Sequence, residues 1–131
     1  MLTLKHALRS AGVLALLLSV IAPSALASDC NMLSSNVDDA RTRLKRATNE
    51  TDFESAKHYA RRVKSALEDT AMSAMDCKCH AAYNEFTTAA SYARWARDAN
   101  DPEAFVDALN RAIGAFNAAI DALHNCARRR Q

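Results

Sequence analysis

The spacing of four cysteines limits the folds open to this chain more than any other feature. Cys77 and Cys79 flank a single residue, Lys78, whereas Cys30 and Cys126 lie far away on either side. The same number of residues separates Cys30 from Cys77 and Cys79 from Cys126. Two cysteines separated by one residue do not easily bridge to each other, so each central cysteine is expected to pair with a distant one.

The first 27 residues are expected to be a cleavable signal peptide. Two basic residues precede an apolar run at 12–21, and Ala25-Leu26-Ala27 supplies the small residues that a signal peptidase requires. The apolar run is shorter than the roughly 20 residues of a membrane-spanning helix. Residues 28–131 are therefore predicted to form one periplasmic or secreted domain, in an oxidising compartment where four cysteines favour two disulfides.

After the signal peptide the sequence predicts an all-α domain of four helices. Apolar residues recur at steps of three and four, and strand-like alternation is absent. The expected helices cover about 31–47, 51–77, 79–100 and 102–127. Thr51 to Glu54 fits a capping box with Thr51 as its first residue, and Asp101 followed by Pro102 is a strong start signal for the last helix.

The connection between the second and third expected helices leaves two architectures open. No glycine or proline marks a turn between the second and third helices. If the chain reverses near Asp76, the helices form an up-down-up-down bundle; if it does not, two outer helices pack along one long bent helix. Because a mean helix has about 11 to 12 residues, an unbroken helix from Thr51 to Asn100 is disfavoured and the four-helix bundle is preferred.

The bundle would gather all four cysteines at one end. Two pairings satisfy the spacing: Cys30–Cys77 with Cys79–Cys126, or Cys30–Cys79 with Cys77–Cys126. The first pairing works in either architecture and is therefore favoured. In the alternative without disulfides, Cys77, Cys79, His80 and His124 could hold zinc or copper. An oxidising compartment, and a single C-x-C in place of the paired C-x2-C of zinc ribbons, argue for disulfides.

A Met near the start and a His near the end of four helices are similar to the pattern of the cytochrome b562 family. In that family two such residues ligate a non-covalent haem within the bundle, and the resemblance would assign this role to Met32 and His124. It covers the architecture and these two residues. The family lacks this cysteine pattern, and Leu33 and Leu123 occupy the apolar seams beside the two positions.

Charge is distributed unevenly along the chain. Basic and acidic residues are equal in number after residue 27, so net charge gives no argument for nucleic acid. The stretch 41–64, however, is strongly basic and could meet an acidic protein surface. The candidate partner-binding residues there are Arg41, Arg43, Arg46, Lys57, Arg61, Arg62 and Lys64. An outer aromatic face with Tyr92 and Trp95 is a second candidate surface.

No nucleophile elbow, glycine-rich loop or other catalytic motif is visible in the sequence. We therefore expect a small exported binding protein, held by disulfides, that engages another exported protein in the manner of an immunity protein or inhibitor, without catalysis. The alternative is a periplasmic carrier of zinc, copper or haem that uses the cysteine and histidine end. Neither a nucleic-acid partner nor stable membrane insertion after signal cleavage is expected.

Overall fold

The computed structural model describes residues 30–130, so the predicted signal peptide lies outside the described residues. Within this range the chain forms four helices and no strand. The first, which we call the N-terminal helix, covers residues 30–49. It is followed by α2 (Phe53–Asp76), α3 (His80–Arg97) and α4 (Pro102–Arg130). None of these helices combines the length and apolarity needed to cross a bilayer.

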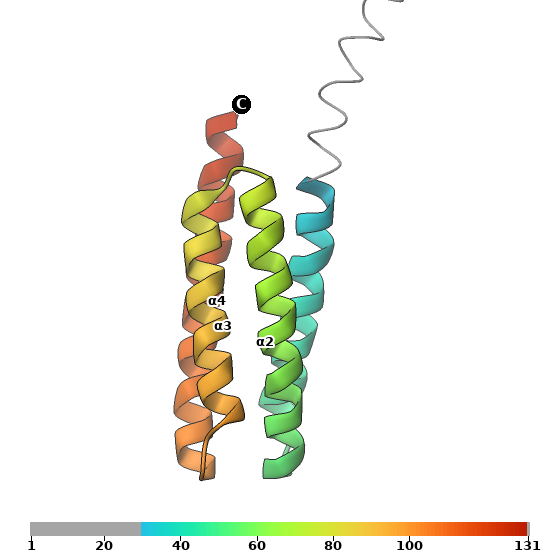
Figure 1. Cartoon of the computed structure of the whole chain (residues 1–131), viewed down its shortest axis with the longest axis vertical. Helices are drawn as coiled ribbons and strands as arrows, with labels where there is room; N and C mark the ends of the chain where they lie inside the picture. The colour runs from blue at the N-terminus through green and yellow to red at the C-terminus, as the bar shows by residue number, and fades with distance from the viewer. Residues whose placement is uncertain (1–29, 131) are drawn as a thin grey trace, which may run out of the picture.

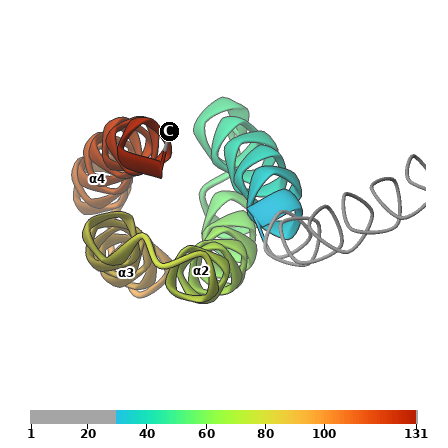
Figure 2. The same cartoon turned by 90° about the horizontal axis from the view of Figure 1, so that it is seen from above.

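The helices form the expected up-down-up-down bundle (Figure 1). α3 packs along both α2 and α4, whereas α2 and α4 make little contact and lie diagonally across the bundle. Seen from above, the four helices follow one another around the bundle (Figure 2). The alternative of one long bent helix is excluded, because α2 ends at Asp76 and α3 begins again at His80.

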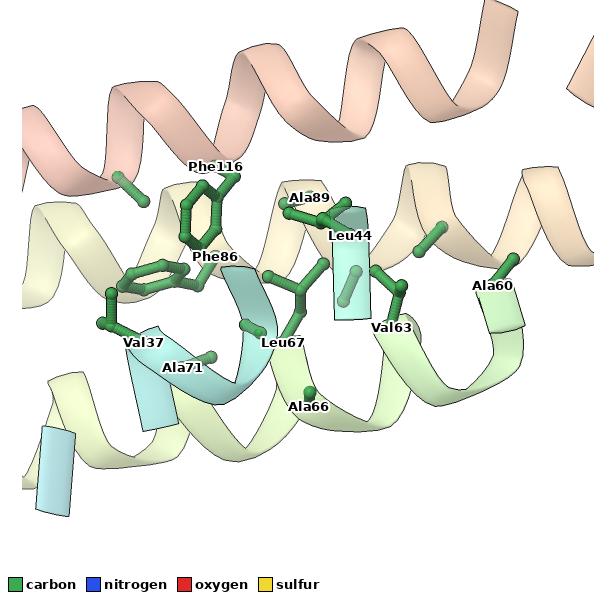
Figure 3. Close-up of a cluster of buried hydrophobic side chains, with 14 of the residues drawn as sticks. Val37, Leu44, Ala60, Val63, Ala66, Leu67, Ala71, Phe86, Ala89 and Phe116 are labelled. Carbon is green, nitrogen blue, oxygen red and sulfur yellow. The ribbon is translucent and has the colours of Figure 1, made fainter. Parts of the chain in front are cut away.

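Alanine dominates the core, and a few large side chains fill its centre (Figure 3). Phe86, Leu67 and Val63 are fully buried, and the rings of Phe86 and Phe116 meet edge to face with centroids 6.0 Å apart. Small alanine side chains let the helices approach closely, so a limited apolar volume suffices for a closed interior. The seams predicted for the N-terminal helix and α2 are buried, with Phe53 half-buried at the end.

The seam of α4 is covered only along its first part. Its residues are buried as far as Phe116, but Ile120 and Leu123 are half-buried and Ala127 is exposed. Figure 2 shows that the N-terminal helix is inclined to α4, so that its blue beginning lies farther from α4 than its green end. The prediction of a continuous buried seam to Ala127 is therefore wrong over the last two turns.

A buried threonine links the N-terminal helix to α2. Thr70 Oγ1 lies 2.7 Å from the carbonyl oxygen of Ala66 and 3.1 Å from that of Asn36, so its single hydrogen has two acceptors. The Asn36 Nδ2 group donates to Ser73 Oγ at 2.5 Å. These hydrogen bonds satisfy a polar group inside an apolar interface and define the register of the two helices.

The starts of α2 and α4 are capped by aspartates. Asp101 caps α4 as predicted, with its Oδ1 accepting from the Ala104 backbone N–H at 2.8 Å. The predicted capping box at Thr51 is wrong by one residue: α2 is capped by Asp52, whose Oδ2 accepts from the Ser55 N–H at 2.9 Å. Adjacent Thr and Asp are both good caps, and sequence spacing alone does not choose between them.

The turn between α2 and α3 is a Schellman motif with a lysine in the position usually held by glycine. The Cys79 N–H donates to the Ala74 carbonyl at 2.9 Å, and the Lys78 N–H donates to the Met75 carbonyl at 3.0 Å. Both bonds are those that define the motif when Cys77 ends the helix. Lys78 accordingly has a φ of 65°, in the left-handed region that lysine rarely adopts.

Candidate partner-binding surfaces

The two disulfides lie at the end of the bundle where α2 meets α3. They join Cys30 to Cys77 and Cys79 to Cys126, the favoured pairing, with Cα separations of 5.3 and 5.8 Å that suit a disulfide. Two such bonds are typical of proteins in an oxidising, extracytoplasmic environment. The first bridge fastens the N-terminal helix to α2, and the second fastens α4 to α3.

The disulfides also remove the cysteine thiolates that a metal ion would need at this end of the bundle. All four sulfurs are covalently paired, so Cys77 and Cys79 offer no thiolate to a metal in this state. Within residues 30–130 no three His, Cys, Asp or Glu side chains come together as a metal-binding group. The alternative zinc or copper set with His80 and His124 is therefore not assembled in the oxidised protein.

The two residues singled out by the cytochrome b562 resemblance are not brought together either. Met32 is 61% exposed on the N-terminal helix and lines no described cavity at this end of the bundle. His124 is also exposed, but it borders a groove between the N-terminal helix and α4. A six-coordinate haem with these two axial ligands is not supported by this arrangement.

The seven basic candidates of the stretch 41–64 do not share one face. Arg41 faces α4, with its guanidinium 5.7 Å from the centroid of the Phe116 ring. Lys64 lines a groove between α2 and α3, and Lys57 lies over the Phe53 ring at 4.9 Å. Residues two apart on a helix do not face the same side, so a basic run in sequence divides among several surfaces.

Three of the seven do converge, in what we call the basic cleft between the N-terminal helix and α2. Arg43 comes from the first helix, and Arg61 and Arg62 come from the second. Arg43 pairs with Asp39 at 3.0 Å, whereas Arg61 and Arg62 make no ion pair within the described residues. The cleft has a volume of about 420 Å³, and its lining consists of Asp39, Arg43, His58, Arg61, Arg62, Ser65, Ala66 and Asp69.

The aromatic face on α3 is real but small. The rings of Tyr92 and Trp95 meet edge to face with centroids 5.2 Å apart, and Trp95 is 54% exposed. Arg94 lies between them in sequence and is also exposed. A single exposed indole beside a half-buried tyrosine provides an anchor for a partner rather than a ligand cavity.

A second cavity, the disulfide-end groove, was not foreseen from the sequence. It lies between the N-terminal helix and α4 and has a volume of about 600 Å³, and three of the four disulfide cysteines line it. Its lining consists of Cys30, Leu33, Ser34, Val37, Asp38, Arg41, Cys77, Cys79, Ile120, Leu123, His124 and Ala127. No sequence signal marks it, because Ile120 and Leu123 have the same spacing as the buried residues before them.

Among the described residues, the side chains with shifted pKa values lie away from both cavities. The pKa of Asp52 is lowered because its carboxylate accepts the Ser55 N–H at the start of α2. The pKa of Asp98 is lowered by a hydrogen bond from Arg97, and the same bond raises the pKa of Arg97. These groups cap and pair at helix ends opposite the disulfides, where they stabilise the fold.

Comparisons with protein-family models, with curated proteins and with solved structures gave no match. Any assignment of function to this bundle therefore depends on its own surfaces.

Proposed function

We propose that this protein is a small exported binding protein that engages an acidic surface of another exported protein through the basic cleft. The observation that carries the proposal is the convergence of Arg43, Arg61 and Arg62 from two helices onto one cleft. Guanidinium groups bind carboxylates in a two-pronged geometry, and two of these three have no carboxylate partner among the described residues.

The disulfide-bonded helical bundle is a rigid support for a binding surface. The two helices that bear the arginines are fastened to each other by the Cys30–Cys77 bridge and by the hydrogen bonds of Thr70, so the backbone positions of the arginines are fixed relative to one another before binding. A preorganised surface loses less conformational entropy on association, which improves affinity without added contacts. A small, disulfide-bonded inhibitor or immunity-like protein is the class that this combination supports.

The metal or haem carrier has less support. Its cysteine ligands are consumed by the disulfides, and Met32 and His124 do not meet in one cavity. We therefore place binding of an acidic protein first.

Charge reversal in the cleft tests the proposal. The tagged, exported protein is used to capture partners from the periplasmic and secreted fractions, with chemical crosslinking and mass spectrometry to identify the partner and the contact residues. Arg61→Glu with Arg62→Glu should abolish capture, and crosslinks should fall on residues beside the cleft. Raised salt should weaken capture by the unchanged protein, because screening reduces attraction between exposed charges.

A matched control changes the net charge by the same amount as the cleft variant. Arg128→Glu with Arg129→Glu changes two adjacent exposed arginines on α4, outside the basic cleft. This variant should capture the same partner as the unchanged protein. Equal loss in both variants, or capture unaffected by the cleft variant, would contradict the proposed interface.

A further inference from the structure

We propose that the disulfide-end groove binds a free fatty acid, with the acyl chain between the N-terminal helix and α4 and the carboxylate at Arg41. This inference is independent of the proposed function, because neither Arg61 nor Arg62 lines the groove. The groove and the basic cleft occupy different faces of the N-terminal helix.

The walls of the groove are apolar and are already in place. Leu33 and Val37 form one wall, and Ile120 and Leu123 form the other. On α4 these positions continue the spacing of the buried seam, yet they remain half-exposed because the N-terminal helix is inclined away. Covering such surface with an acyl chain gains about 25 cal/mol for each Å² removed from water.

No disulfide joins the two walls. Cys30–Cys77 fastens the N-terminal helix to α2, and Cys79–Cys126 fastens α4 to α3. Neither bridge joins the N-terminal helix to α4, so no crosslink draws the walls of the groove together. Clefts between the helices of a bundle are common places for small-molecule sites.

The size of the groove suits a small ligand. Its volume of about 600 Å³ lies within the range of about 300 to 1,000 Å³ typical of small-molecule sites. The lining on the N-terminal helix extends from Cys30 to Arg41, a length of about 16 Å at 1.5 Å per residue.

Arg41 provides the polar end of the site. Its Nη1 donates to Asp38 Oδ1 at 3.2 Å, and no other bond from its guanidinium is made within residues 30–130. A guanidinium carries five N–H donors in a planar fork, so several remain for a carboxylate head. The guanidinium carbon lies over the Phe116 ring, 5.7 Å from its centroid, and Arg41 is the last residue of the N-terminal helix that lines the groove.

Binding is tested by calorimetric titration of the exported protein with dodecanoate, kept below its micelle-forming concentration. The unchanged protein should bind saturably with one ligand per chain. Ile120→Glu, which places a carboxylate on the apolar wall, should weaken binding at least tenfold. Val106→Glu is its matched control: Val106 is 53% exposed on the same helix and does not line the groove, so its change should leave the affinity intact.

The head group is tested separately. Arg41→Gln should weaken dodecanoate binding about tenfold, as expected for loss of a charged hydrogen bond, but should leave the binding of neutral dodecanol unchanged. Arg111→Gln is the control, since Arg111 forms a similar exposed pair with Asp107 outside the groove. Circular dichroism melts of every variant establish that each remains folded.

Four titration results would overturn the inference. These are the absence of saturable dodecanoate binding, an affinity unchanged by Ile120→Glu, an affinity unchanged by Arg41→Gln, and tighter binding of a lysophospholipid with the same dependence on both residues. The last would identify a membrane lipid as the ligand. Sedimentation that detects a dimer lost in Ile120→Glu would show that a second copy covers the groove, and would also refute it.

Discussion

Removing one disulfide with Cys30→Ala and Cys77→Ala should lower the free energy of unfolding by about 4 kcal/mol. The bridge joins residues 47 apart, and a crosslink over a loop of this length removes about 14 cal/mol/K of entropy from the unfolded chain. The second bridge, Cys79–Cys126, also spans 47 residues and closes a separate loop. Its removal should therefore cost the same amount.

The two losses should add, because the loops share no residue and each constrains a different half of the unfolded chain. Together they amount to about 8 kcal/mol, which is comparable to the whole stability of a small domain at about 5 to 15 kcal/mol. The variant without all four cysteines should therefore be largely unfolded. Alanine is the replacement of choice because Cys77 and Cys79 are buried, and serine would place hydroxyl groups in an apolar site.

Urea unfolding followed by far-ultraviolet circular dichroism measures these losses, with the free energies extrapolated to water. The reasoning would be refuted if either pair cost less than about 1 kcal/mol, or if the two pairs differed by more than about 2 kcal/mol, since loops of equal span should contribute equally. The intact mass of the unchanged protein, measured before and after reduction, establishes that both bridges are present in the sample.

Two further changes test the ends of α2. Lys78→Gly should raise the free energy of unfolding by about 1 kcal/mol, because glycine adopts the positive φ of 65° without steric cost. The control is Lys45→Gly, on the exposed face of the N-terminal helix, which should lower the free energy of unfolding by about the same amount. Asp52→Ala should lower the urea midpoint at pH 7. The folded pKa of Asp52 lies below its ordinary value of 3.8, so its contribution is present above that pH and is lost as the pH falls through the folded pKa. The midpoints of the two proteins should therefore converge in acid, and a gap that did not narrow as the pH fell below 3.8 would contradict this origin.

Much of the fold could be predicted from residue spacing. Steps of three and four placed residues such as Leu44, Val63 and Phe86 in the core, where the structure has them. The turn at Lys78 was harder, because the glycine that usually marks such a turn is missing. The sequence shows it only indirectly, through two cysteines that must bridge in different directions.

The candidate surfaces could be predicted less well. The basic run at 41–64 suggested one patch, but a helix turns by 100° per residue and separates Arg41 from Arg43 onto different faces. Only Arg43, Arg61 and Arg62 lie together, and that grouping depends on the register between two helices. The register is defined in part by Thr70, a residue whose role does not follow from its own helix.

The order of residues was thus enough to predict four amphipathic helices, because periodicity is a property of the polypeptide itself. It favoured the reversal between the second and third helices, and one of the two disulfide pairings, without deciding either. Only packing in three dimensions decided where α4 stays uncovered and which arginines become neighbours. The spacing of apolar residues determines which face of each helix is buried. How much of that face is covered depends on the tilt and rotation of the neighbouring helix.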